Sequence, residues 1–393
     1  MAFIVVVNFA RRYGSVLQCR IAVAGFLLLP FTASGHTAAA FDDDGGERWL
    51  AEGRQGIVIG LTGRQSVHAG LEALKDGGNA ADAALTTAMV QVVEMGGSVV
   101  SFAGILSMTY YEADTGKVHF LNACYNTPLE EKDPLSIPAF DLTSLKGTPS
   151  GRTALVPGFM AGVRAAHTRF GVLPFARLFE PSIVLAEDGF EIDPLLATYI
   201  ALRKNVLERL PETRRIFTKP DGSLYGQGDM FRQPDLAKTL KSVATKGPQY
   251  LAAGDWGRQF VEAVQRDGGV ITVEDLEKYR PTWEAPLETT YGDARVFAPG
   301  ASSTGGADVI ESLNLLELSN IARLGPPTGS GASLFWLAQF THNQQYMEAS
   351  DLVSRRYPGR DFSPAARASK GHARWLWQRM RQGEWPYAAK PTG

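Results

Sequence analysis

The sequence predicts an α+β fold, on the basis of its composition and of two kinds of hydrophobic pattern. Apolar residues make up 45% of the 393 residues and charged residues 20%, which is typical of a chain that buries a sizeable core. Short runs typical of strands are concentrated near residues 56–121 and 289–298, and runs with helical spacing occupy much of the rest. We find no internal repeat and expect one domain, α+β or layered α/β.

The first forty residues predict a signal peptide. Arg11, Arg12 and Arg20 precede the apolar run Ile21–Phe31, and small residues follow up to Ala40. A positive stretch, a short apolar run and an A-x-A end are typical of secretory signals. An apolar run this short is too short for a stable membrane span, although an N-terminal anchor is the alternative. We therefore expect residues 1–40 to be cleaved and the protein to be periplasmic or secreted, without stable membrane insertion.

The first elements of the mature chain are a buried strand and two helices. The run Gly56–Leu61 predicts the strand, and apolar spacing predicts helices over Ser66–Lys75 and Ala80–Val93. Between the helices, two glycines stop the first and Asn79 caps the second. The second helix is almost wholly apolar, so we expect it to be buried on most faces.

A hairpin and a series of helices follow. Alternating runs over Ile105–Glu112 and Lys117–Leu121, joined by a D-x-G turn, predict the hairpin. Residues 128–150 are rich in proline and predict a loop. Further helices are predicted over Val163–Phe170, Phe175–Asp188, Tyr199–Leu210, Pro234–Thr245 and Val261–Arg266, then from a Thr272 cap, and over Ala307–Glu317 and Ser333–Ser350; Val296–Ala298 predicts a strand.

Several classes of function are excluded by composition. Lys and Arg total 39 against 41 for Asp and Glu, so no basic field is available to hold nucleic acid. Two cysteines cannot build a disulfide framework or a Cys-rich zinc site, and six histidines are scattered without ligand spacing. We therefore expect no metal and no cofactor. Because Cys19 lies in the predicted signal, Cys124 is the one thiol expected in the mature chain.

The glycine- and serine-rich loop Pro299–Gly306 allows two interpretations. It lies between the predicted strand at 296–298 and the helix from Ala307, where free backbone N–H groups and a helix N-terminus could cradle an anion. The same composition also suits a plain tight connection.

An ordered series of motifs resembles the γ-glutamyltranspeptidase family. The family's pattern G-G-N-A-x-D-A-A occurs here at Gly77–Ala84, and four further patterns follow in the family's order. They are V-P-G-x-x-A-G at Val156–Gly162, L-A-E-x-G-F at Leu185–Phe190, G-G-x-x-T-x-x-D-L-x-x-Y at Gly268–Tyr279, and P-x-S-S-G-G, with inserted residues, at Pro299–Gly306. The resemblance runs from about residue 56 to 350.

This resemblance implies a four-layer αββα N-terminal-nucleophile hydrolase fold and a precursor that cuts itself. In such enzymes the first Thr of the small subunit is the nucleophile and its α-amine is the general base. Because no such start follows within this sequence, residues 41–393 resemble the large subunit alone. We expect no catalytic residue in it, and we expect a Thr or Ser nucleophile just after Gly393, with Thr392 as the fallback. The implied partners are the small subunit from the same precursor and a small amide or γ-glutamyl substrate.

One departure from the family concerns the substrate. The family's R-E-T-A-P carries an Arg that pairs with the α-carboxylate of the γ-glutamyl group, and alignment on Pro128 places Cys124 at that position. A thiol cannot replace a bidentate guanidinium. We expect Cys124, Tyr125 and Asn126 to form one wall of the acyl pocket. The alternatives are an acylase-type relative with a substrate that is not γ-glutamyl, and a non-catalytic binding or scaffold homologue.

Overall fold

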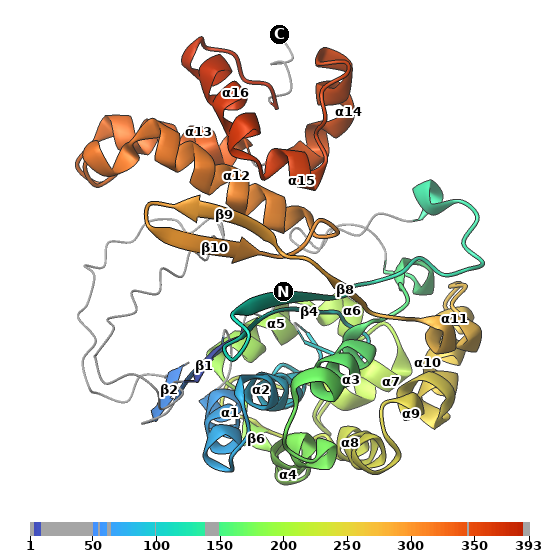
Figure 1. Cartoon of the computed structure of the whole chain (residues 1–393). Helices are drawn as coiled ribbons and strands as arrows, with labels where there is room; N and C mark the ends of the chain where they lie inside the picture. Colours follow the sequence, from blue (N-terminus) through green and yellow to red (C-terminus); the bar gives the residue numbers. More distant parts are fainter. Residues whose placement is uncertain are drawn as a thin grey trace. The chain divides into compact units, whose positions relative to one another are not determined.

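The computed structural model describes residues 4–8, 50–53, 56–60, 64–98, 100–137, 149–343 and 346–387. These residues belong to two compact units, each formed by two stretches of chain. Unit 1 combines Met1–Val100 with Phe170–Thr245, and unit 2 combines Ser101–Arg169 with Lys246–Gly393. Each unit mixes helices with short antiparallel sheets, which confirms the α+β class (Figure 1).

Unit 1 opens with a three-stranded antiparallel sheet of order β1-β3-β2. Its strands are β1 (Ile4–Asn8), β2 (Leu50–Gly53) and β3 (Gly56–Gly60), and β3 is the strand predicted from Gly56. Of the predicted signal peptide, the structure describes only the five residues of β1. The apolar run Ile21–Phe31, like Thr392 and Gly393, lies outside the described residues.

The helices α1 (Arg64–Lys75) and α2 (Ala80–Glu94) explain the first family-like motif. Asn79 and Asp82 form a capping box at the start of α2, as the spacing predicts. The Asp82 carboxylate is fully buried and also accepts the Val172 N–H at 3.1 Å. A Cβ on Gly78 would lie 2.6 Å from the Ala73 carbonyl oxygen, so only glycine fits there. This motif therefore serves the packing of unit 1.

The rest of unit 1 differs from the expected helices at two places. Pro181 and Pro194 explain where two of these helices begin, because proline suits the first helical turn. The predicted helix Phe175–Asp188 is a 3₁₀ turn, Phe175–Phe179, followed by α4 (Glu180–Asp188) with Pro181 in its first turn. The predicted helix Tyr199–Leu210 is wrong, since α5 (Pro194–Leu202) starts earlier under an Asp193 cap and ends before α6 (Lys204–Leu207). The remaining elements are β6 (Phe190–Glu191), α7 (Pro211–Phe217), β7 (Met230–Phe231) and α8 (Pro234–Lys246).

Unit 2 contains the predicted hairpin and a third strand beside it. The strands β4 (Leu106–Glu112) and β5 (Lys117–Ala123) pair antiparallel with Glu112 opposite Lys117. The short strand β8 (Thr282–Glu284) joins the free edge of β5, which gives the order β4-β5-β8. Around this sheet the chain forms α3 (Phe159–Phe170), α9 (Gln249–Ala253), α10 (Asp255–Arg266) and the Thr272-capped α11 (Val273–Lys278).

The C-terminal part of unit 2 is a hairpin followed by helices. The strands β9 (Leu287–Tyr291) and β10 (Ala294–Ala298) pair antiparallel, and β9 packs on α12 (Thr304–Ser319), as Figure 1 shows. In the region of the helix expected over Ser333–Ser350, the described residues form α13 (Gly331–Asn343) and α14 (Tyr346–Arg356), and positions 344–345 lie outside them. The chain continues through α15 (Pro364–Arg367) and α16 (Lys370–Arg381). Within the described residues, no helix is both long and apolar enough to cross a membrane.

A buried polar network joins α12, α15 and α16. Arg367 donates from Nε to Glu311 Oε2 at 3.1 Å and from Nη2 to Asp308 at 2.5 Å. The Tyr387 hydroxyl donates to Glu311 Oε2 at 3.0 Å and lies 2.8 Å from Nε2 of His372. Burial lowers the pKa of His372 to about 3, with the charges of nearby arginines adding to the effect, so its imidazole is neutral. Four of these side chains are almost completely buried, and they fix the register of the C-terminal helices.

Candidate functional site

The three predicted substrate-binding residues are consecutive and begin directly after β5. Cys124 is half-buried and carries a free thiol, while the side chains of Tyr125 and Asn126 are exposed. The Cys124 N–H donates to Asn122 Oδ1 at 3.0 Å, and the Cys124 carbonyl accepts the Tyr279 hydroxyl at 2.5 Å. The backbone of Cys124 is therefore held on both sides, independently of its side chain.

The motif at Val156–Gly162 holds the next part of this segment. Asn126 and Val156 form an antiparallel bridge through two backbone hydrogen bonds, of 3.2 and 2.9 Å. A Cβ on Gly158 would lie 2.2 Å from both the Ala123 carbonyl oxygen and the Tyr279 hydroxyl. Any other residue at 158 would push the segment away, so the glycine of this motif has a packing reason.

The motif at Gly268–Tyr279 holds both ends of the segment. Tyr279 bonds to Cys124, and the buried Asp275 accepts the Leu129 N–H at 2.7 Å. Burial, together with the nearby Cys124 thiol, raises the pKa of Tyr279 to about 12, so its hydroxyl stays a donor at neutral pH. Asp275 also belongs to the capping box with Thr272, which fixes its carboxylate.

The glycine- and serine-rich loop reaches the same segment through Ser302. Asn122 Nδ2 donates to Ser302 Oγ at 2.9 Å and to Glu284 Oε1 at 3.3 Å, and the Ser302 N–H donates to Glu284 Oε2 at 3.3 Å. The N–H groups of Ser303 and Gly306 donate to carbonyl groups within the loop. These three N–H groups therefore hold the loop to itself and to Glu284, as in a tight connection.

Three motifs that lie far apart in the sequence thus hold residues 122–129, which we call the clasped segment. Such a rigid segment can present Tyr125 and Asn126 to a ligand at little cost in entropy. The nearby Arg152 does not offer a replacement for the family's arginine, because it is bound bidentately to Glu131, at 2.8 and 3.2 Å. No cationic side chain belongs to residues 122–129.

Sequence reasoning missed five residues that build this site. They are Asn122, Asp275, Tyr279, Glu284 and Ser302. Asp275, Tyr279 and Ser302 lie in the family-like motifs, but a motif in the sequence does not reveal which distant residues it contacts. Asn122 is next to the predicted residues, and Glu284 carried no signal because its strand has only three residues.

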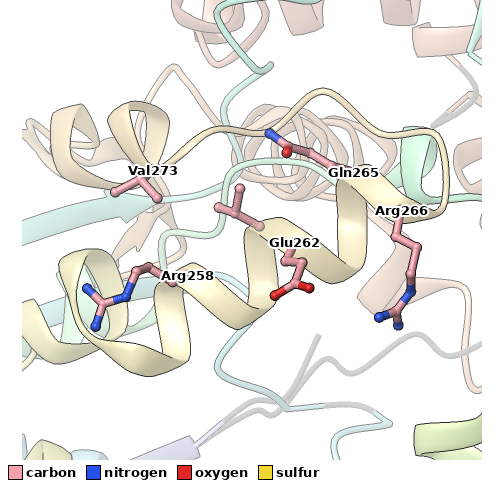
Figure 2. Close-up of a pocket in the computed structure, with 6 residues that line it drawn as sticks. Arg258, Glu262, Gln265, Arg266 and Val273 are labelled. Atoms are coloured by element: carbon pink, nitrogen blue, oxygen red, sulfur yellow. The ribbon is translucent and has the colours of Figure 1, made fainter.

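A surface depression on α10 is a second candidate, shown in Figure 2. Its volume is about 470 Å³, and Arg258, Glu262, Gln265 and Arg266 project from one helix, with Val273 from the start of α11. Two of these polar side chains already have partners within the protein. Arg258 forms an ion pair with Asp255, and Gln265 donates to the Ile271 carbonyl. The described residues contain no cluster of three or more potential metal ligands.

Comparison with solved structures defines the class of protein. A crystal structure of Helicobacter pylori γ-glutamyltranspeptidase aligns with a TM-score of 0.70 and 24% identity, covering 84% of this chain and 92% of that one. A cephalosporin acylase from Bacillus halodurans aligns with a TM-score of 0.61 and 23% identity, covering 80% of this chain and 57% of that one. The fold is that of the N-terminal-nucleophile hydrolases.

Sequence comparison narrows the class to a family. The γ-glutamyltranspeptidase family model matches residues 66–353, so this chain belongs to that family. Glutathione hydrolase proenzyme 1 of Schizosaccharomyces pombe is 29% identical over 288 residues, covering 73% of this chain and 44% of that protein. Acylase ACY 1 proenzyme of Pseudomonas sp. strain SE83 is 29% identical over 291 residues, covering 71% and 50%. The chain therefore spans half or less of each of these relatives.

Proposed function

We propose that this chain is the large subunit of an exported amide hydrolase or acyltransferase that cleaves or transfers a γ-glutamyl or related acyl group. The nucleophile is a Thr or Ser that directly follows Gly393 in the complete precursor, and its own α-amine takes up the hydroxyl proton. The chain's contribution is one wall of the acyl pocket, and the chain alone has no activity. The proposed mature start is near Phe41, after loss of the signal peptide 1–40.

The clasped segment is the observation that carries this proposal. Two of the family's motifs supply Gly158, Tyr279 and Asp275 to hold this segment, and a third supplies Ser302. The side chains of Tyr125 and Asn126 nevertheless stay exposed. Holding an exposed segment this firmly costs conformational entropy, which a surface loop without a ligand does not need to lose. A preorganised wall for a substrate accounts for that cost.

A substrate without an α-carboxylate is the second candidate, and Cys124 favours it. In water-shielded sites a guanidinium binds a carboxylate through two charged hydrogen bonds, which a thiol cannot make. Arg152, one arginine near the clasped segment, is paired with Glu131. A relative of similar identity carries the name of an acylase, which supports a broader range of acyl groups within the family.

The proposal is tested on the complete precursor, expressed from the natural gene. Purified protein should yield two fragments, and N-terminal sequencing of the smaller one should begin with Thr or Ser directly after Gly393. The processed protein should release p-nitroaniline from γ-glutamyl or simple acyl anilides, whereas purified 1–393 should release none. A precursor that stays uncut and inactive would favour the non-catalytic homologue instead.

A further inference from the structure

The side chain of Glu284 lies at the junction of three elements of unit 2. In the pairing of β5 with β8, Phe120 is opposite Glu284 and Asn122 is opposite Thr282. Directly paired residues share a face of a sheet, so Asn122 and Glu284 project to the same side. The glycine-rich loop approaches this face closely, because a Cβ on Gly300 would lie 2.9 Å from Glu284 Oε2.

The Glu284 carboxylate accepts hydrogen bonds from neutral donors of all three elements. Oε1 accepts Asn122 Nδ2 at 3.3 Å and Thr282 Oγ1 at 3.1 Å, and Oε2 accepts the Ser302 N–H at 3.3 Å. Burial acts to raise the pKa of Glu284, but these hydrogen bonds outweigh it and hold the pKa below its ordinary value. Among the described residues, no lysine, arginine or histidine forms an ion pair with this carboxylate. The hydrogen bonds that this carboxylate accepts therefore hold its neighbours in place.

Glu284 also determines which way the Asn122 amide faces. Glu284 Oε1 can only accept, so it requires the NH₂ group of Asn122 on that side, where Ser302 Oγ accepts from it as well. The amide oxygen must then point the other way, where it accepts the Cys124 N–H at 3.0 Å. With a neutral or absent side chain at 284, the amide could turn over and lose the bond to Cys124.

We infer that Glu284 is a positioning residue for the acyl pocket: its carboxylate ties the Ser302 loop to Asn122 and, through Asn122, sets the backbone of Cys124. This inference rests on the proposed function for its link to catalysis, although the coupling itself does not depend on that function. Glu284 does not touch the reacting atoms and acts through Asn122.

The test compares Glu284→Gln and Glu284→Ala with matched variants of Glu288 in the full-length protein. Glu288 lies on β9, the next strand along the chain, and forms an exposed ion pair with Arg295. In Glu284→Gln one of the two carboxylate oxygens becomes an NH₂ donor, so either Asn122 Nδ2 or the Ser302 N–H loses the oxygen that accepts from it. The first readout is the rate at which iodoacetamide alkylates Cys124, followed by peptide mass spectrometry, with thermal melting to establish that each variant is folded.

We expect both Glu284 variants to speed alkylation of Cys124 by about tenfold, since losing hydrogen bonds to a charged group favours local opening. The Glu288 variants should stay within about twofold of wild type, as exposed ion pairs contribute little. In the processed enzyme the Glu284 variants should raise KM for the acyl anilide with kcat nearly unchanged, and Glu284→Asp should recover part of the loss.

Alkylation at the wild-type rate in folded Glu284→Gln and Glu284→Ala proteins would overturn the inference, as would equal effects from the Glu288 variants. Alkylation needs no turnover, so the two proposals can fail separately. If the Glu284 variants are alkylated faster than wild type but the precursor is inactive, only the proposed function is contradicted. If the enzyme is active but the Glu284 variants are alkylated at the wild-type rate, only the role of Glu284 is contradicted.

Discussion

At the scale of single residues, position 124 combines a fixed backbone with a changed side chain. The Cys124 peptide is held by Asn122 and Tyr279 through main-chain atoms, so exchange of the side chain leaves these hydrogen bonds in place. Tyr125 follows Cys124 directly in the chain. Partial burial raises the pKa of Tyr125, and the nearby Cys124 thiol adds to this effect. Substitution at 124 therefore changes the proposed acyl pocket while leaving these backbone hydrogen bonds in place.

We predict that Cys124→Arg in the processed enzyme strengthens binding of γ-glutamyl compounds by roughly 1.5–3 kcal/mol, because the guanidinium can pair with the α-carboxylate. The measurement is the KM of γ-glutamyl-p-nitroanilide, with Cys124→Gln as a control of similar size without charge. Equal KM values for the arginine and glutamine variants would show that residue 124 does not face the carboxylate position.

At the scale of elements, the start of α1 depends on a carboxylate from the end of α2. Glu94 is nearly buried and accepts the Gln65 N–H at 3.1 Å. Burial raises its pKa from 4.5 to about 7, although hydrogen bonds from Ser66 and Gln65 oppose the shift. The folded protein thus holds this proton more tightly than the unfolded chain does.

The consequence is a stability that falls as pH rises from about 4.5 to about 7. Glu94→Gln, which is neutral throughout, should lack this contribution and gain up to about 3 kcal/mol relative to wild type between pH 5 and pH 8. Denaturant unfolding at the two pH values measures it. A constant difference between variant and wild type would mean that the Glu94 carboxyl has an ordinary pKa.

The network around Arg367 supports a second prediction at this scale. Arg367→Met leaves Glu311 buried without its cation, which typically costs 3–5 kcal/mol, so urea unfolding should begin at clearly lower concentration. Arg295→Met, which breaks the exposed pair with Glu288, should cost less than about 1 kcal/mol. If the two variants unfold at the same urea concentration, the network does not hold the C-terminal helices.

At the scale of the whole molecule, the described residues expose strand edges and apolar side chains. Edge strands such as β4 and β10 present unpaired backbone groups, and Leu334 and Phe335 of α13 are about half exposed. We predict that isolated 1–393 binds a dye specific for apolar surface and aggregates, because in the proposed enzyme a small subunit covers this surface. A soluble monomer with a cooperative thermal transition and no dye binding would contradict the prediction.

Much of the fold could be predicted because local signals and tertiary packing agree. Some features depend only on a few residues that are close in sequence. These are the hairpin at 106–123, the Asn79 cap and the Thr272 capping box. The break at Arg203 was missed because the apolar spacing of Tyr199–Leu210 continues across it. The clasped segment could be located but not its supports, since contacts such as Tyr279 with Cys124 join residues more than 150 positions apart.

The most direct test of the account is the substrate preference of the complete processed enzyme. Its kcat/KM should be compared for γ-glutamyl-p-nitroanilide and for 4-aminobutanoyl-p-nitroanilide, which differs by the missing α-carboxylate. Because Cys124 supplies no cation, we predict values within about tenfold of each other, the ratio that corresponds to 1.4 kcal/mol. A preference of about a hundredfold or more for the carboxylated substrate, the scale of a charged contact that contributes about 3 kcal/mol, would contradict the account.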